Sequence, residues 1–221
     1  MHDCLTNLIE IEKKIQLKIN NKPNLLTTPQ IIAVSKTFPM KEILPLINHG
    51  HIHFGENKVQ ETIEKWSSIK FDFTHLQLHL VGKLQTNKVK YAVQIFDYIH
   101  SLDSLKLAEK ISIEQKKFKR NIKIFIQINI GNEEQKNGIP ISEAQEFYNK
   151  CINDFGLNII GFMCLPPNTD NNSLYFSKMK KLISESKIKE LSMGMSGDYM
   201  EALDFQSTFL RIGSSIFGKR V

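Results

Sequence analysis

Small residues gather near the C-terminus of the chain, in a stretch whose chemistry suits an anion. It runs LSMGMSGDYMEALDFQSTFLRIGSSIFG, from Leu191 to Gly218. The pattern predicts a strand over 191–195, a short helix over 198–205 and a second strand that ends at Ser215. Glycine and serine at strand ends leave backbone N–H groups uncovered, and such groups bind anions, most commonly phosphate. The stretch therefore predicts a phosphate site.

Lys36 is a candidate nucleophile. It follows the apolar run Ile31–Val34, which predicts a strand buried on both faces. A lysine at the end of a buried strand is partly desolvated, which favours a neutral amine that can form Schiff bases with carbonyl groups. By position alone, a solvated surface charge is the simpler interpretation. Opposite a phosphate site, Lys36 instead indicates a sugar phosphate or pyridoxal 5′-phosphate (PLP) as ligand.

Arg211 helps to choose between these two ligands. It lies immediately before the small residues Gly213 and Ser214. PLP held there by its phosphate, and at Lys36 by its aldehyde, would place its ring nitrogen beside the guanidinium. That charge would keep the nitrogen unprotonated and weaken the ring as an electron sink. The structural alternative is an arginine paired with a carboxylate.

Alternating strands and helices must position these residues. Apolar runs predict eight strands, at residues 31–34, 51–57, 74–82, 98–102, 122–130, 157–164, 191–195 and ending at 215. Helical patterns separate them, at 41–48, 58–67, 86–95, 104–117, 142–154, 172–186 and 198–205. Such α/β alternation predicts a parallel sheet that closes as a (β/α)8 TIM-type barrel. An extra N-terminal helix over 2–20 would fill the outer ring, since no helix is predicted after the last strand. The alternative is an open doubly wound sheet.

Length and composition agree with one barrel domain over residues 1–221. The chain is 41% hydrophobic and 24% charged, which is typical of globular proteins. Its net charge of +6 comes from scattered lysines and not from a stripe, which argues against nucleic-acid binding. No apolar run is long enough to span a membrane, and no secretory signal precedes the first helix. Three widely separated cysteines favour reduced thiols in a cytoplasm.

Short motifs recur through residues 33–218 in a specific order. They are AVSKT (33–37), FGEN (54–57), HLVG (79–82), LQTNK (84–88), HSLDS (100–104), QINI (127–130), GFM (161–163), LSMGMS (191–196) and RIGSSIFG (211–218). The ordered set resembles the YggS/PROSC family of PLP-binding proteins, the pyridoxal phosphate homeostasis proteins. Three positions depart from the family pattern: Leu78 replaces a usual aromatic, Lys83 lies at a variable position and Cys164 replaces a small residue.

The resemblance implies a barrel similar to the N-terminal domain of alanine racemase, with PLP as cofactor. Lys36 matches the lysine that forms the Schiff base, and Arg211 matches the arginine at the ring nitrogen. The matches to the phosphate ligands are Ser192, Gly213 and Ser214. Asn57 matches an asparagine that lines the pocket. No metal site is expected.

Two further patterns concern local roles. Ser196 or Asp198 is predicted to cap the helix over 198–205, and Asp198 with Glu201 has capping-box spacing. His79 is predicted to be a satisfied histidine at a strand end, in preference to a proton carrier.

The sequence favours a PLP carrier or buffer over an enzyme, with apo PLP-dependent enzymes as partners and a monomeric state. A racemase needs a second acid/base group, usually a tyrosine from a C-terminal domain, and this chain ends three residues after Gly218. Tyr199 comes nearest to that role. The alternatives are a PLP-dependent enzyme, such as an amino-acid racemase with weak activity, and a Schiff-base aldolase, which needs Lys36 and the phosphate site but not Arg211.

Overall fold

Eight parallel strands form a closed barrel at the centre of the molecule. The computed structural model describes residues 3–22, 28–133, 135, 137–167 and 171–218. Each strand pairs with the next along the chain, and the last pairs with the first. The strands are β1 (Gln30–Val34), β2 (His53–Glu56), β3 (Gln77–Leu80), β4 (Tyr98–Leu102), β5 (Lys123–Ile128), β6 (Asn158–Cys164), β7 (Glu190–Met195) and β8 (Phe209–Ile212). The predicted barrel is confirmed, and the open-sheet alternative is wrong.

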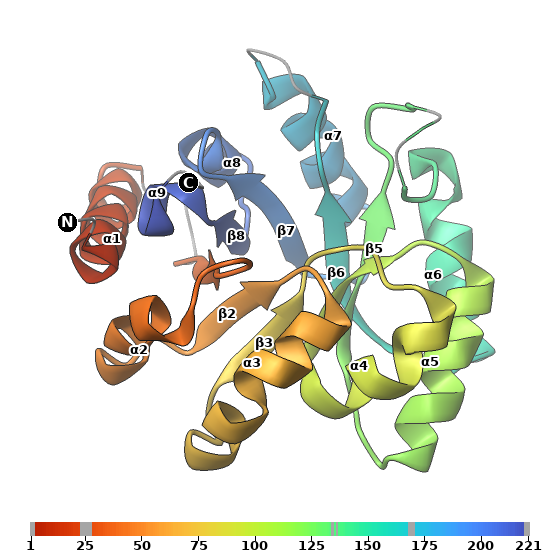
Figure 1. Cartoon of the computed structure of the whole chain (residues 1–221). Coiled ribbons are helices and arrows are strands. Elements are labelled where there is room, and N and C mark those ends of the chain that lie inside the picture. Colours follow the sequence, from red (N-terminus) through yellow and green to blue (C-terminus); the bar gives the residue numbers. More distant parts are fainter. Residues whose placement is uncertain (1–2, 23–27, 134, 136, 168–170, 219–221) are drawn as a thin grey trace.

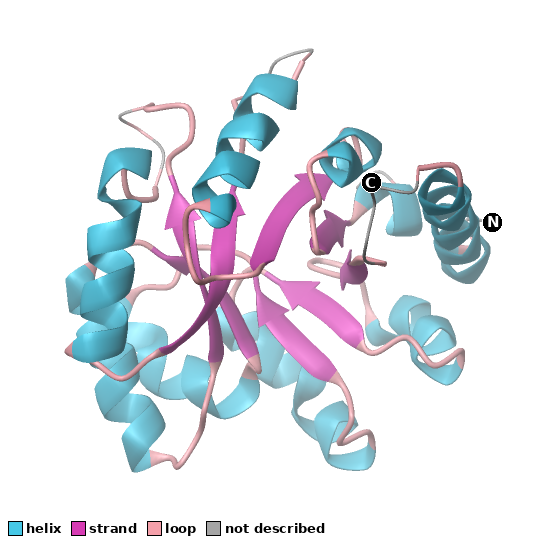
Figure 2. Cartoon of the chain, turned by 180° about the vertical axis from the view of Figure 1, so that it is seen from behind, coloured by secondary structure: helices cyan, strands magenta, loops and turns pink. Residues whose placement is uncertain are grey.

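Helices surround the barrel, and Figure 2 shows them outside the central strands. They are α1 (Cys4–Asn20), α2 (Met40–Asn48), α3 (Val59–Asp72), α4 (Val89–Ile95), α5 (Leu105–Lys117), α6 (Ala144–Asn153), α7 (Ser173–Ser184), α8 (Tyr199–Asp204) and α9 (Ser214–Phe217). The short 3-10 turns η1 (Thr86–Lys88) and η2 (Ile141–Glu143) precede α4 and α6. Each helix that the hydrophobic periodicity predicts coincides with an observed helix, because each of these helices buries one apolar face against the strands.

The chain after the last strand differs from the prediction. β8 ends at Ile212 and Ser214–Phe217 form α9, so the expectations of a strand to Ser215 and of no following helix are wrong. The backbone of Gly213 leaves the extended region (φ −115°, ψ −76°), which turns the chain into the helix.

The N-terminal helix completes the outer ring beside α9. Figure 1 shows α1 next to α9, and α1 packs on both α9 and α2. The amide of Asn7 donates to the carbonyl of Ile216 over 2.8 Å. The expected role of this helix is therefore confirmed, although the described helix begins at Cys4 and residue 2 lies outside the described residues.

The interior of the barrel contains polar as well as apolar side chains. A small apolar cluster lies there, formed by Ile32, Val34, Tyr98, Phe125, Met163 and Phe209. Between these side chains are five buried polar residues, His53, His79, His100, Ser192 and Arg211. Buried polar groups require partners, so this set must be mutually hydrogen-bonded. His79, the next-to-last residue of β3, lies inside the barrel and has a partner at each ring nitrogen, so the prediction of a satisfied histidine is confirmed.

None of the described helices is long and apolar enough to cross a membrane. Within the described ranges, no cluster of histidine, cysteine, aspartate and glutamate has the composition of a metal site.

Candidate functional site

The carboxyl ends of the strands surround a cavity of about 640 Å³, called here the upper cavity. Its walls come from the loops after β1, β3, β6, β7 and β8. The lining residues are Val34, Lys36, Phe38, Val81, Leu165, Pro166, Met195, Ser196, Gly197, Arg211, Gly213, Ser214 and Gly218. This volume suits a small ligand, and the carboxyl end is where barrels of this type carry function.

Four of the six predicted site residues meet at this cavity: Lys36, Arg211, Gly213 and Ser214. The other two, Asn57 and Ser192, are not among its lining residues. The side-chain oxygen of Asn57 is buried without a hydrogen-bond partner in the described part of the chain. Ser192 is fully buried in the barrel, so the geometry gives no support to its role as a phosphate ligand.

Arg211 lies between the barrel interior and the upper cavity. Its guanidinium donates to Ser192 Oγ over 2.6 Å and to the carbonyl of Cys164 over 2.8 Å. Burial lowers the pKa of Arg211. No ion pair found among the described residues includes Arg211, so that part of the chain gives no support to the alternative of an arginine paired with a carboxylate. A buried cation facing a cavity without a carboxylate partner is suited to a ligand with an electron-rich group.

Backbone N–H groups converge on Ser196 at the edge of the same cavity. The Oγ of Ser196 accepts from the N–H of Gly213 (3.3 Å) and from the N–H of Ser215 (3.2 Å). Two N–H groups aimed at one oxygen, beside a cavity, form the concave donor arrangement that anions use. Ser196, Gly213 and Ser214 thus form one group of donors along the wall of the upper cavity, called here the cup. The sequence signal was the motif LSMGMS, which contains two serines, and the structure distinguishes them.

The helix-capping predictions for this loop are confirmed in position only: Asp198 is the N-cap residue of α8, but the predicted capping box with Glu201 is not formed. Asp198 occupies the N-cap position of α8 but makes no side-chain cap hydrogen bond there. Its carboxylate accepts instead from the N–H of Met195 (2.6 Å) and from the amide of Asn172 (2.8 Å). Glu201 accepts from the hydroxyl of Ser173 in place of closing a capping box. Asp198 therefore ties the loop after β7 to α7 and leaves Ser196 available to the cavity.

A buried carboxylate supports the loop that carries Lys36. Glu56 is 1% exposed and accepts from Ser35 Oγ (2.8 Å), Trp66 Nε1 (3.0 Å) and Lys65 Nζ (2.6 Å). Lys65 Nζ also donates to the carbonyl of Ser35 over 2.9 Å. The network fixes the residue immediately before Lys36 from both its side chain and its backbone. Sequence reasoning missed it, although a glutamate inside the buried strand motif FGEN was the available signal.

The backbone next to Lys36 is strained. Thr37 has φ of 69°, a left-handed conformation that a β-branched residue rarely adopts. Such a residue costs on the order of 1–3 kcal/mol and persists only where the surroundings impose it. The Glu56 network, which holds Ser35 two residues earlier, supplies that constraint, so the loop holds Lys36 at the mouth of the barrel.

Replacing Glu56 with alanine is expected to destabilise the protein by about 3–5 kcal/mol, because it removes the buried carboxylate that pairs with Lys65 and leaves the buried Trp66 N–H without its acceptor. Urea unfolding followed by circular dichroism measures the change. The control is Glu61→Ala, which breaks the exposed Lys58–Glu61 pair and should cost about 0–1 kcal/mol. Equal losses in the two variants would contradict the assigned role of Glu56.

Comparisons with known proteins place this geometry in a family. Residues 13–221 match the family model "Alanine racemase, N-terminal domain". The chain is 33% identical to the pyridoxal phosphate homeostasis protein of Pasteurella multocida, over 97% of this chain and 96% of that protein. It is 35% identical to the human protein of that name, over 95% of this chain and 84% of the relative.

Solved structures agree with these sequence matches. PipY of Synechococcus elongatus PCC7942, solved without PLP, is 32% identical, with a TM-score of 0.82 over 92% of this chain and 100% of that chain. The same protein solved with PLP bound gives 31% identity and a TM-score of 0.79. Alanine racemase of Clostridium difficile 630 shares the fold alone, at 16% identity and a TM-score of 0.69 over 56% of its own length. The chain therefore belongs to the alanine racemase N-terminal domain family and, within it, to the pyridoxal phosphate homeostasis proteins, the YggS/PROSC family.

Proposed function

We propose that this barrel domain, over residues 1–221, binds PLP as a Schiff base on Lys36 and serves intracellular PLP homeostasis as a carrier or buffer. The observation that carries the proposal is the meeting of Lys36, Arg211, Gly213 and Ser214 at one cavity. Membership of the homeostasis-protein family and the PLP-bound structure of PipY support it.

The residues present fit this cofactor. Lys36 supplies an amine for the aldehyde, and the cup of Ser196, Gly213 and Ser214 supplies donors for the phosphate. Arg211 supplies a fixed positive charge for the ring nitrogen. The unpartnered oxygen of Asn57 is a further polar atom that a ligand or water could satisfy. Bound PLP would supply a reactive aldehyde and an electron-withdrawing ring, which Arg211 keeps weak by opposing ring protonation.

Arg211→Leu separates PLP binding from sugar-phosphate chemistry. We expect the variant to keep a Schiff base on Lys36 but to show a shifted cofactor absorption spectrum, since the charge beside the ring nitrogen is gone. An aldolase would not need that charge. An unchanged spectrum in the loaded variant would contradict the place given to Arg211 in this proposal.

Ser196→Ala is expected to weaken PLP binding about 10- to 100-fold, because a hydrogen bond to a charged group contributes about 1.5–3 kcal/mol. Equilibrium titration with PLP, followed by absorbance, measures the change. Ser177→Ala is the matched control, since Ser177 is an exposed serine on α7 that bonds only its own helix at Leu174. A dissociation constant that Ser196→Ala leaves unchanged would remove Ser196 from the phosphate cup.

A carrier must hold PLP without turning over amino acids. None of the five tyrosines is among the described residues that line the upper cavity, and Tyr199 is buried in α8. The side chain that a racemase would use as its second acid/base group is therefore not supplied by a tyrosine of this cavity. Purified protein should transfer PLP to an apo PLP-dependent enzyme and should racemise no amino acid. Turnover that Lys36→Ala abolishes would establish the alternative, a PLP-dependent racemase.

The remaining proposals concern the binding partners, the oligomeric state and the cellular compartment. We expect apo PLP-dependent enzymes as recipients, and a monomer in solution. Cys4, Cys151 and Cys164 are free and buried, which supports the proposal of a reducing, cytoplasmic compartment.

A further inference from the structure

Three histidines and a serine form a continuous hydrogen-bonded chain through the barrel. His53 Nδ1 lies 2.9 Å from His79 Nε2, and His79 Nδ1 lies 2.9 Å from His100 Nε2. His100 Nδ1 lies 2.9 Å from Ser192 Oγ, which accepts from Arg211. The chain therefore connects four strands, β2, β3, β4 and β7, with Arg211 on β8.

Packing fixes the rings of this chain. The His79 ring stacks on Tyr98 at 4.1 Å between ring centroids, and the His100 ring stacks on Phe125 at 4.3 Å. Both histidines are fully buried, and burial holds their pKa values well below the ordinary range. Burial also lowers the pKa of His53, to about 4. All three imidazoles are accordingly neutral at pH 7, with one N–H and one acceptor nitrogen each.

The number of available hydrogen-bond acceptors determines which way the protons point along this chain of side chains. Ser192 Oγ receives the N–H of Arg211, and among the described residues its own proton has one acceptor within reach, His100 Nδ1. If His100 Nδ1 carried a proton, the buried hydroxyl would have no acceptor, which costs about 1–3 kcal/mol. His100 is therefore protonated on Nε2 and donates to His79 Nδ1. By the same count His79 donates from Nε2 to His53 Nδ1, and His53 carries its proton on Nε2.

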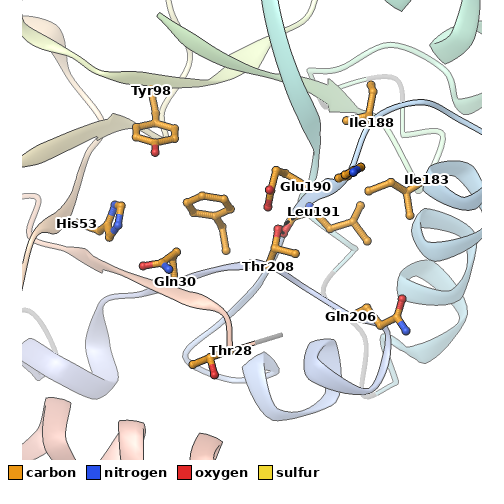
Figure 3. A pocket seen from close by; sticks show the side chains of 12 residues that line it. Thr28, Gln30, His53, Tyr98, Ile183, Ile188, Glu190, Leu191, Gln206 and Thr208 are labelled. Carbon is orange, nitrogen blue, oxygen red and sulfur yellow. Dashed lines mark hydrogen bonds between the residues drawn. The ribbon is translucent and has the colours of Figure 1, made fainter. Parts of the chain in front are cut away.

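The hydrogen-bonded chain of side chains ends at a second cavity, at the opposite end of the barrel from the candidate site. This lower cavity has a volume of about 780 Å³, and its lining includes Gln30, His53, Tyr98, Thr208 and Phe209 at the starts of β1, β2, β4 and β8. Figure 3 shows His53, Gln30 and Tyr98 facing it from different strands. A hydrogen-bonded path thus runs from the lower cavity to the arginine that lines the upper one.

We propose that His53, His79 and His100 form a positioning relay, each as the neutral Nε2–H tautomer, which fixes Ser192 as the acceptor for Arg211. The relay sets the position of the guanidinium in the upper cavity from inside the barrel. Its consequence for the cofactor rests on the proposed function, because only with PLP bound does the position of Arg211 determine the charge beside the ring nitrogen. The relay itself is a property of the protein without ligand.

Nitrogen NMR of the cofactor-free wild-type protein, labelled with ¹⁵N-histidine, tests the relay directly. Long-range ¹H–¹⁵N spectra at pH 7 should show His53, His79 and His100 each with a protonated Nε2 and an unprotonated Nδ1. Slow exchange of the His79 and His100 protons with water is expected, since both rings are fully buried. A protonated Nδ1, or a charged ring, at any of the three positions would overturn the proposal.

Two substitutions of His100 test the effect on Arg211. His100→Asn retains an acceptor near the Nδ1 position for Ser192, whereas His100→Leu removes it. In PLP-loaded proteins we expect a wild-type spectrum for the asparagine variant and a shifted, pH-dependent band for the leucine variant. Ser112→Ala is the control, a buried serine on α5 that donates to the carbonyl of Phe155 outside the barrel interior.

The outcomes separate this inference from the proposed function. A wild-type spectrum in the folded leucine variant would overturn the positioning role even if the tautomers are as stated. If the wild-type protein takes up no PLP, the proposed function fails, while the NMR result still decides the relay. If the leucine variant does not fold, Ser192→Ala replaces it, and an unshifted band there overturns the positioning role.

Discussion

A Lys36→Ala protein is expected to lose the violet absorption band of the PLP-loaded wild-type protein completely. Lys36 lies at the mouth of the barrel, in the loop that Glu56 and Lys65 hold through Ser35. Alanine offers no amine for a Schiff base. The phosphate cup and Arg211 are unchanged in this variant, so free PLP should still bind, but weakly and with the absorbance of the unlinked aldehyde.

The control for this experiment is a second lysine at the same end of the barrel. Lys83 follows β3 and donates to the side chain of Asn137 over 2.6 Å, outside the lining of the upper cavity. Lys83→Ala should keep the full band. A band that persists in Lys36→Ala, or that is lost from both variants, would contradict a Schiff base on Lys36.

Acid is expected to unfold the protein near pH 5, before most of its carboxylates are protonated. Burial lowers the pKa of His51 and His53 to about 4, and the pKa values of His79 and His100 lie well below 6.5. The unfolded chain binds protons at these four histidines as the pH falls through 6.5, and the folded chain does not. Stability is thus fully present above pH 6.5 and is lost as the pH falls towards 4.

The size of this effect follows from the proton count. Each histidine that is neutral when folded and charged when unfolded removes about 1.4 kcal/mol per pH unit, so four remove about 5 kcal/mol per pH unit. At pH 5 the loss relative to a pH well above 6.5 reaches about 8 kcal/mol, comparable to the whole stability of a typical domain, about 5–15 kcal/mol. Asp3, Glu114, Glu146 and Asp204, whose pKa values are lowered by their hydrogen bonds, add their losses only at lower pH.

Urea unfolding at a series of pH values measures that slope. His51→Phe should reduce the slope by about a quarter, because it removes one of the four histidines whose pKa is lowered by burial. His51 is not part of the relay, since its Nε2 bonds the backbone carbonyl of His53. Ser177→Ala, which removes no titratable group, should leave the slope unchanged. A wild-type slope near that of a single proton would show that the barrel histidines are not buried as neutral groups.

The fold could be predicted from the sequence because its signals are local and repeated. Ile31–Val34 is a continuous apolar run and Lys123–Ile128 is mostly apolar, as strands buried on both faces require, and amphipathic helices alternate with them. The end of the last strand could not be predicted in this way. Gly213 permits either an extended or a turned backbone, and contacts of α9 with α1, distant in the sequence, accompany the turn.

The candidate site was predictable only in part, for a similar reason. Lys36, Arg211, Gly213 and Ser214 lie at strand ends, so the barrel geometry brings them together. Whether Ser192 or Ser196 faces the cavity depends on where β7 ends and how the following loop turns, which the motif LSMGMS does not state. The histidine relay was hidden because His53, His79 and His100 are separated along the chain and meet only across a closed barrel.

Borohydride reduction of freshly purified wild-type protein, followed by peptide mass analysis, identifies the lysine that carries PLP. Reduction converts a Schiff base into a stable pyridoxyl-lysine, so the label records which lysine carried PLP. We predict that the pyridoxyl mass appears on the peptide containing Lys36 and on no other lysine peptide, in proportion to the violet band that the reduction removes. Protein that carries no pyridoxyl mass after incubation with PLP, or carries it on surface lysines and not on Lys36, would contradict the account.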